Sequence, residues 1–355
     1  MTISNRILGG VGAGAVLLAA LSFGAQAQEK QKINVLMANE RTTSLYGAFV
    51  AQELGIYDDL GIEVNLLSSA TTVPYVAFLA NGDADLVMLD SAQVYQALNA
   101  QQPISVIYEV QQYASEAIIV ESNSPIQSLT DLPGKTIGLA SDRDQVTAVI
   151  ALNSVDLSIN DVSTVVVGES GPILAASLKN GQVDAFAGSQ PDLAAVEANG
   201  VTFRNITPAA VSEVPGNSYV IWNDRKEELR DVVTKFLLGW SMGNHAGVID
   251  TKAVAAMAKK NIPEQWENLA VGLKLLDTSV YKTGLVRTRL RGETQPDVWQ
   301  RIQDPYIKIG EISGPIDPAT FLDDSFIEGA NAYKTADLKA RLAKWKEANA
   351  DILLP

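Results

Sequence analysis

The chain has 355 residues and a formal net charge of −14, from 41 acidic and 27 basic side chains. This charge disfavours nucleic acid and anionic membranes as partners. The sequence contains no cysteine and a single histidine, His245, which excludes disulfides and zinc sites built from cysteine and histidine. A Ser-His-Asp set would need that one histidine, so we expect a protein that is not an enzyme and holds no metal or cofactor.

The first 27 residues have the features of a secretory signal peptide. Arg6 gives a basic start, residues 7–23 form an apolar run, and Ala25-Gln26-Ala27 is a small-x-small cleavage site. The alternative is a permanent membrane anchor, which requires roughly 20 apolar residues, whereas this run is shorter and rich in glycine. We expect cleavage after Ala27 and release of a soluble protein into the periplasm.

Strands and helices are predicted to alternate through the next 200 or so residues. Apolar runs of strand length are rich in valine and isoleucine, which is typical of parallel strands covered on both faces. These runs lie at 33–38, 62–67, 86–89, 104–110, 117–120, 136–140, 164–167, 183–187 and 219–222. Helical segments are predicted between them at 45–53, 74–80, 92–99, 145–153, 172–179 and 193–197. The alternation predicts an α/β fold.

One segment of the chain occurs twice. Residues 79–86, Leu-Ala-Asn-Gly-Asp-Ala-Asp-Leu, return at 178–185 as Leu-Lys-Asn-Gly-Gln-Val-Asp-Ala. In both copies a helix is predicted to end at Asn-Gly, because glycine just past a helix adopts the left-handed conformation that closes it. A turn and an apolar run follow, so each copy predicts a helix, a turn and a buried strand. Two such lobes suggest a ligand-binding cleft between them.

The C-terminal third of the chain is predicted to be helical. Helices are expected at 227–242, 252–259, 263–275, 296–309 and 336–349, with no strand among them. The first of these helices is expected to end at Gly243-Asn244, so His245 would follow its end, away from the turns considered next. Such a helical region usually packs back on one lobe.

The turns that follow the strands carry the candidate ligand-binding residues, because ligands of open α/β sheets bind beyond the carboxyl ends of strands. Helix N-termini at those turns offer unpaired N–H groups that bind anions. Every helix needs a cap, so capping residues alone prove nothing, whereas convergence of several turns on one cleft would indicate a site. The candidates are Thr42, Thr43, Asp90, Ser91, Ser141, Asp142, Ser170, Ser189 and Gln190.

Two arginines stand in these turns and are further candidates. The guanidinium groups of Arg41 and Arg143 are able to form paired hydrogen bonds with a carboxylate or a sulfonate. The alternative is an exposed arginine paired with Glu40 or Asp142. Aromatic residues near the turns or crossings would stack on a flat ligand or belong to the core, and these are Tyr46, Tyr113 and Trp222.

Several motifs resemble one protein family. The stretch at 53–64, Glu-Leu-Gly-Ile-Tyr-Asp-Asp-Leu-Gly-Ile-Glu-Val, and the Asp-Leu-Pro-Gly-Lys element at 131–135 both occur in characteristic order with the Asn-Gly-x-x-Asp repeats. Together they resemble the substrate-binding proteins of bacterial ABC importers for nitrate, sulfonates, taurine and thiamine-pyrimidine precursors. The resemblance covers roughly 33–225 and, more loosely, the helical tail.

The resemblance implies a two-lobed type II periplasmic-binding fold with a helical C-terminal region. Residues 28–112 plus 223–355 would form the first lobe and 113–222 the second, joined by crossings near 109–117 and 213–222 that act as a hinge. Family members bind ligand through turns matching 39–44, 90–91, 141–144 and 188–191, and through crossing residues that here are Gln112 and Tyr113. Gln190 stands where the family often has an acid, and the turn at 141–144 is unusually charged.

The resemblance also implies a function. We expect a monomeric periplasmic protein that captures a small organic anion or zwitterion, such as a sulfonate or taurine, and delivers it to an ABC permease with its ATPase. Two alternatives stay open, namely a pyrimidine precursor of thiamine as ligand, and presentation of the ligand to a membrane sensor. An enzyme of this fold, a eukaryotic pyrimidine synthase, depends on histidine and a cysteine-rich motif that this sequence lacks.

Overall fold

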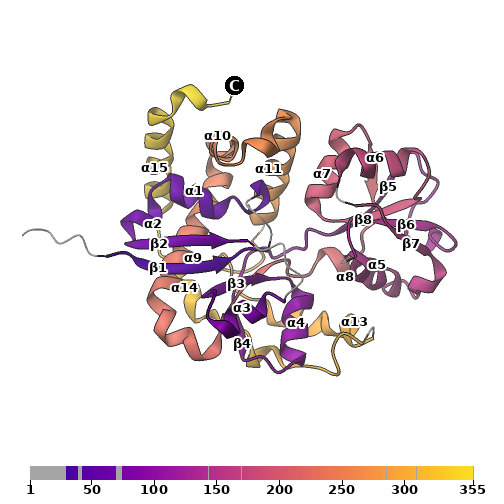
Figure 1. Ribbon diagram of the computed structural model, residues 1–355, viewed down its shortest axis with the longest axis horizontal. Coiled ribbons are helices and arrows are strands. Elements are labelled where there is room, and N and C mark those ends of the chain that lie inside the picture. Colours follow the sequence, from indigo (N-terminus) through magenta and orange to yellow (C-terminus); the bar gives the residue numbers. More distant parts are fainter. Residues whose placement is uncertain are drawn as a thin grey trace, which may run out of the picture.

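The computed structural model describes residues 29–38, 42–68, 74–142, 144–168, 170–284, 286–308 and 310–354. Its strands form two five-stranded sheets, one in each lobe (Figure 1). The first sheet has the order β2 (Ile62–Leu67), β1 (Gln31–Leu36), β3 (Leu86–Leu89), β10 (Ser218–Trp222) and β4 (Ile104–Glu109). The second has the order β7 (Ser163–Val166), β6 (Thr136–Leu139), β8 (Ala185–Gly188), β5 (Ala117–Glu121) and β9 (Phe203–Asn205).

Helices cover the sheets of both lobes (Figure 1). The second lobe carries α5 (Asp144–Asn153), α6 (Gly171–Lys179), α7 (Gln190–Ala198) and α8 (Ala209–Ser212). The first lobe carries α1 (Gly47–Glu53), α2 (Ile56–Asp59), α3 (Val76–Asn81), α4 (Ser91–Asn99), α9 (Lys226–Ile249), α10 (Thr251–Asn261), α11 (Leu269–Gly284), α12 (Pro296–Arg301), α13 (Gln303–Lys308), α14 (Ile327–Ala330) and α15 (Thr335–Ala348). The predicted two-lobed α/β fold with a helical C-terminal region is confirmed.

The repeated segment forms the same hydrogen bonds in both lobes. Gly82 and Gly181 adopt left-handed φ values of 76° and 65°, which end α3 and α6 as predicted. The Asp85 backbone N–H then donates to Asn34 O at 2.8 Å, and its carboxylate accepts from Asn34 N at 2.8 Å. Asp184 makes the same pair of bonds with Thr136, at 2.8 and 2.9 Å. The aspartate of each repeat therefore ties its strand to the parallel neighbour, β3 to β1 and β8 to β6.

The expectation of parallel strands covered on both faces is wrong for part of each sheet. Strand β10 runs antiparallel to β3 and β4, and β5 runs antiparallel to β8 and β9. Strand β5 begins where the chain enters the second lobe, and β10 begins where it re-enters the first. Both strands are largely buried, which gives them the same apolar composition as a parallel strand. The expected lobe boundary at residue 222 needs correction, because β10 belongs to the first sheet. Strand β7 is an exposed edge.

The C-terminal helices differ from the prediction in their bounds. The segment predicted at 263–275 is a 3-10 turn, η5 (Pro263–Trp266), followed by α11, and the one at 296–309 divides into α12 and α13. Helix α9 continues past 243–244, the end that its sequence suggested, so His245 is helical. Gly243 is required for packing instead, because a Cβ there would lie 1.9 Å from the carbonyl oxygen of Gly47 in α1.

The two segments that connect the lobes lie side by side. Val110 N donates to Asn217 O at 2.9 Å, Gly216 N donates to Gln111 O at 2.9 Å, and Ala114 N donates to Ser212 O at 3.2 Å. A pair of adjacent connections is the arrangement that a hinge between lobes requires. We propose that the hinge lies at 110–116 and 206–217.

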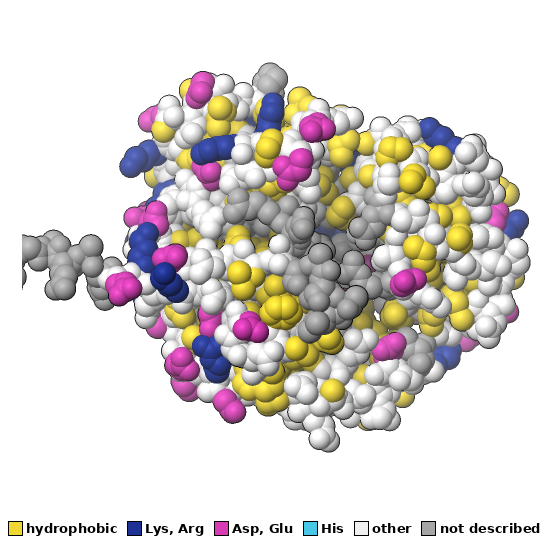
Figure 2. All heavy atoms as spheres, in the orientation of Figure 1, with side chains coloured by type: hydrophobic (Ala, Val, Ile, Leu, Met, Phe, Trp, Pro, Cys, Tyr) yellow, Lys and Arg dark blue, Asp and Glu magenta, His cyan; other side chains and the backbone are white. Residues whose placement is uncertain are grey.

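Two surface features bear on partners. Among the described residues, no helix combines the length and the apolar character that crossing a bilayer would need. On the described part of the face in Figure 2, lysines and arginines stand among acidic and apolar side chains instead of forming one continuous basic surface.

Loss of the repeat carboxylate should destabilise the first lobe. We expect Asp85→Ala to lower the free energy of unfolding by about 1.5–3 kcal/mol, the range for hydrogen bonds to charged groups, because Asn34 N and Arg225 lose their acceptor. Urea denaturation measures the loss. The exposed neighbour Asp83 supplies the control, and equal stability of Asp83→Ala and Asp85→Ala would contradict the role assigned to Asp85.

Candidate functional site

Two turns of the second lobe carry identical caps. Ser141 donates to Asp144 from its backbone N–H and its hydroxyl, both at 2.8 Å, and Ser189 donates to Asp192 in the same way at the same distances. Ser141 and Asp144 have the sequence spacing of a capping box, with aspartate in place of the usual glutamate, and the half in which Asp144 accepts from Ser141 N is present. Burial raises the pKa of Asp144, and the Asp192 carboxylate lies close enough to raise it further.

A turn of the first lobe reaches the same place. Asp90 accepts from Gln93 N at 2.8 Å and Gln93 Oε1 accepts from Asp90 N at 3.0 Å, which caps α4. The Ser91 and Tyr306 hydroxyls are hydrogen-bonded at 3.1 Å. Burial raises the pKa of Tyr306, and the carboxylates of Asp90 and Glu116 add to the effect. Asp90 and Ser91 thus stand close to the crossing that leads into the second lobe.

Glu116 and Lys282 lie where these turns meet. Glu116 is half-buried on the crossing, next to the start of β5, and burial together with the Asp90 carboxylate raises its pKa, while Lys282 lowers it. Lys282 lies at the end of α11 and donates to Ala114 O at 2.7 Å. Burial lowers the pKa of its ammonium. We call the meeting of these groups, Asp90, Glu116, Asp144, Asp192 and Lys282, the lobe junction.

The lobe junction presents both acidic and basic side chains to a ligand. Glu116 accepts a hydrogen bond from its neighbour Ser115 at 3.2 Å and no cation of the described chain lies within ion-pair distance of it. The Asp144 and Asp192 carboxylates are instead occupied by their caps. Glu116 is therefore the carboxylate at the junction that is best placed to accept hydrogen bonds from a bound N–H group or ammonium.

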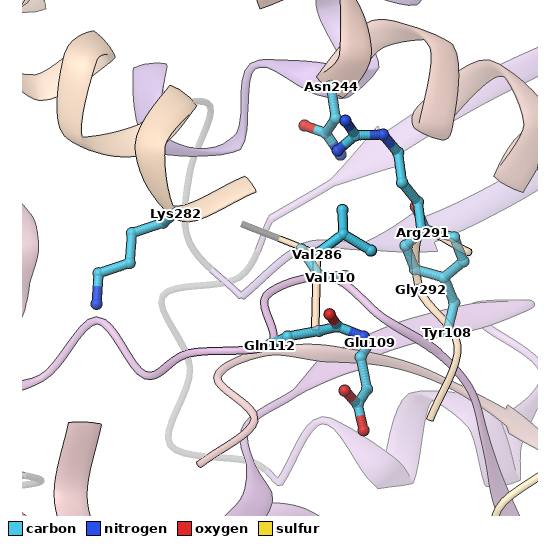
Figure 3. A pocket seen from close by; sticks show the side chains of 9 residues that line it. All are labelled: Tyr108, Glu109, Val110, Gln112, Asn244, Lys282, Val286, Arg291 and Gly292. Carbon is cyan, nitrogen blue, oxygen red and sulfur yellow. The ribbon is translucent and has the colours of Figure 1, made fainter. Parts of the chain in front are cut away.

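A pocket opens beside the junction in the first lobe (Figure 3). Lys282 points from the end of α11 towards the crossing, while the Arg291 guanidinium lies next to the Asn244 side chain. The Asn244 Oδ1 atom is buried and has no hydrogen-bond partner among the described residues. The pocket is lined by Tyr108, Glu109, Val110, Gln112, Asn244, Lys282, Val286, Arg291 and Gly292.

Two predicted crossing residues contact the C-terminal segment at 287–293. The Gln112 side-chain amide donates to Thr288 Oγ1 at 2.7 Å and to Glu293 O at 2.9 Å, and its oxygen accepts from Arg287 N at 2.6 Å. The Tyr113 ring lies under the Arg287 guanidinium, 4.3 Å from the ring centroid. These contacts hold the pocket wall against the crossing.

The turn after β1 is also occupied by the C-terminal part of the chain. Thr43 N donates to Gln265 Oε1 at 2.8 Å, and the Thr43 hydroxyl accepts from Trp266 Nε1 at 3.2 Å. Gln265 Nε2 donates to the Thr42 hydroxyl at 3.2 Å. Both threonines are buried. Their described contacts therefore connect η1 (Thr43–Leu45) to η5.

The other predicted residues have different environments. Asp142 and Ser170 are exposed, whereas Gln190 is buried and bonds to α11. Tyr46 is a core residue whose hydroxyl donates to Asn244 O at 2.8 Å, and Trp222 packs partly buried against a second core cluster. Arg41 and Arg143, with Glu40 and Glu169, lie outside the described residues.

Sequence reasoning missed the two charged residues of the lobe junction. Glu116 has a local signal, since an acid directly precedes the buried run of β5. The only sequence signal for Lys282 is its helical spacing. It shares a face of α11 with Leu275 and Ser279, at positions i, i+4 and i+7. Neither signal indicates by itself that the two residues meet.

Known proteins resemble the chain in sequence and in fold. A family model described as NMT1/THI5 like matches residues 42–246. A putative thiamine biosynthesis protein of Haemophilus influenzae is 28% identical over 161 residues, or 45% of this chain, and the match spans only half of that relative's length. The riboflavin-binding protein RibY of Chloroflexus aurantiacus is 21% identical over 305 residues, which are 84% of each chain.

A solved structure supports the fold. The periplasmic aliphatic sulphonate binding protein SsuA from Escherichia coli superposes with a TM-score of 0.64 at 16% identity, over 82% of this chain and 91% of that chain. The fold suspected from the sequence motifs, that of periplasmic binding proteins, is thereby confirmed.

Stability should depend on pH through Glu109, which lies at the end of β4 in the pocket wall. Its carboxylate accepts from Gln295 N, Gln295 Nε2 and Trp299 Nε1 at 2.8–2.9 Å, yet burial raises its pKa from 4.5 to about 7. The folded protein keeps this proton to higher pH than the unfolded chain. The contribution of Glu109 to the free energy of unfolding is therefore largest below pH 4.5 and falls as the pH rises towards 7.

We expect Glu109→Gln to remove this fall. Between pH 4.5 and 7.5 the parent protein should lose about 3 kcal/mol of unfolding free energy relative to Glu109→Gln. Urea denaturation at the two pH values measures the difference, and Glu347→Gln on the exposed face of α15 is the control. A parent-to-variant difference that is equal at both pH values would contradict the assignment.

Proposed function

Because the chain belongs to the NMT1/THI5-like family, we propose that it is the solute-binding component of an ABC importer. It is exported to the periplasm, cleaved after Ala27, and captures a small solute between its lobes by closure at the hinge. The observation that carries this proposal is the contact between the lobes beside Glu116. Lys282 of α11 donates to Ala114 O on the crossing at 2.7 Å, and Gln190, on the turn after β8, donates to Leu275 O of α11 at 3.1 Å. The role that we propose is the binding of a solute, which is also what the name of the sulphonate-binding neighbour states for that protein.

The charges at the lobe junction favour a ligand that bears both signs. A taurine-like zwitterion would place its ammonium at Glu116, and its sulfonate would accept from Lys282 and from N–H groups of the surrounding turns. A simple anion such as nitrate would leave the Glu116 carboxylate facing a like charge or water. The zwitterion therefore fits the described junction better than an anion without an amine.

An aminopyrimidine is the second candidate. One relative is named as a putative thiamine biosynthesis protein and another as a riboflavin-binding protein, and the ligands these names imply contain nitrogen heterocycles. The Glu116 carboxylate would accept from the exocyclic amine of such a base, and from a ring nitrogen once that nitrogen is protonated. Tyr113 on the crossing would offer an aromatic face, although Arg287 already covers one side of it.

The proposed partners are an inner-membrane permease and its ATPase, with the binding protein acting as a monomer. Presentation of the ligand to a membrane sensor is the alternative. The two differ in one observable, because deletion of the gene abolishes uptake of the solute only if the protein serves an importer.

Glu116→Gln should separate the ligand classes. If the ligand is a taurine-like zwitterion, the variant should bind taurine about 10- to 100-fold more weakly, since one charge-assisted hydrogen bond contributes about 1.5–3 kcal/mol. Binding of methanesulfonate, which has no amine, should stay the same or tighten. Calorimetry measures both affinities, after a thermal-shift screen with taurine, methanesulfonate, nitrate and 4-aminopyrimidine.

The control for this experiment is Glu347→Gln, which changes charge equally on the exposed face of α15. Stabilisation by 4-aminopyrimidine and not by taurine would select the second candidate. Stabilisation by nitrate or methanesulfonate alone, with Glu116→Gln unchanged, would contradict the role of Glu116.

A further inference from the structure

Helix α11 belongs to the first lobe but contacts the second. It packs against α9, α10 and η1 in its own lobe and against α7 of the second lobe (Figure 1). Leu275, Ser279 and Lys282 follow at i, i+4 and i+7, so they share one face of the helix. That face contains the contacts to α7 and to the crossing.

The central contact is made by Gln190, the first residue of α7. Its side-chain Nε2 donates to Leu275 O and to Ser279 Oγ, both at 3.1 Å. The Ser279 hydroxyl in turn donates to Leu275 O at 2.6 Å, which leaves its lone pairs free to accept from Gln190. Gln190 and Ser279 are both buried, at 5% and 0% exposed, so water does not compete for these bonds.

Two further contacts flank this one along α11. Lys274 forms an ion pair with Glu197 of α7 at 3.2 Å, and Lys282 donates to Ala114 O on the crossing at 2.7 Å. The Lys274 and Glu197 side chains are about half exposed, so their ion pair contributes little energy and mainly orients the helices. The buried hydrogen bonds of Gln190 are therefore the specific part of the contact.

The identity of residue 190 matters chemically. A glutamate, the acid that the family resemblance suggests at this position, has no N–H to donate when ionised and would place a carboxylate against the Leu275 carbonyl. Glutamine supplies the donors that this contact needs. Its Oε1 is buried without a partner among the described residues, which costs free energy and weakens the contact.

We propose that Gln190 is a positioning residue that, with Ser279, latches the lobes together through α11 before any solute binds. The proposal rests on the proposed function for its purpose, because a latched protein must release α11 to admit its solute. Release of these hydrogen bonds opens the cleft, and they form again when the lobes close around the solute. Gln190 thus serves closure of the cleft, in place of the ligand contact expected from the sequence.

The test measures the distance between the lobes without ligand, so it does not depend on identifying the solute. The chain has no cysteine, which permits clean attachment of two spin labels at Ala176→Cys on α6 and Lys259→Cys on α10, both exposed positions. Pulsed electron–electron double resonance then gives the distribution of distances between the two spin labels. The parent should show one population, and Gln190→Ala and Ser279→Ala should each add a second population at longer distance.

Ser177→Ala is the matched control, because Ser177 is also a buried helical serine and donates to Leu174 O at 2.7 Å, but within the second lobe only. It should leave the distribution unchanged. Melting temperatures check that each variant is folded. Distributions for Gln190→Ala and Ser279→Ala that match those of Ser177→Ala would overturn the latch, whereas failure of every solute to bind would overturn only the proposed function.

Discussion

The rest of the molecule depends on one contact that occurs in both lobes, in which an aspartate carboxylate, Asp85 or Asp184, accepts a hydrogen bond from the neighbouring strand. Strands β3 and β8 have only four residues each, so few ladder hydrogen bonds are available to fix their register. Asp85 and Asp184 add a charge-assisted bond and a backbone bond to the parallel neighbour. Because register is fixed, the turns at 90–91 and 189–190 both begin at the strand ends that face the other lobe.

Features determined by neighbouring residues were predictable, and features determined by distant ones were not. The glycines at 82 and 181, and the cap joining Ser141 to Asp144, depend on positions at most five residues apart. By contrast, the partner of Thr43 is 222 residues away, and that of Gln112 is 175 residues away. Both were predicted to bind ligand, and the sequence does not reveal that the C-terminal third of the chain also contacts them.

Two sequence patterns, an apolar strand and a glycine within a helical segment, each have two possible physical causes. A fully buried antiparallel strand such as β10 has the same apolar composition as a parallel one, so strand direction was not readable. Gly243 suggested a helix end because glycine often closes helices. Here it permits α9 to approach the backbone of Gly47 in α1, a contact that brings η1 and the C-terminal helices together. Only tertiary packing distinguishes these cases.

The departure at residue 190 and the acid at residue 116 are best understood together. The family resemblance suggests an acid on the turn after β8, where this chain has glutamine bonded to α11. A carboxylate is found instead at Glu116, on the crossing. An acid on the turn would move with the second lobe, whereas one on the crossing would stay near the proposed hinge. We infer that this chain holds its ligand's donor group next to the hinge, where closure changes the distance least.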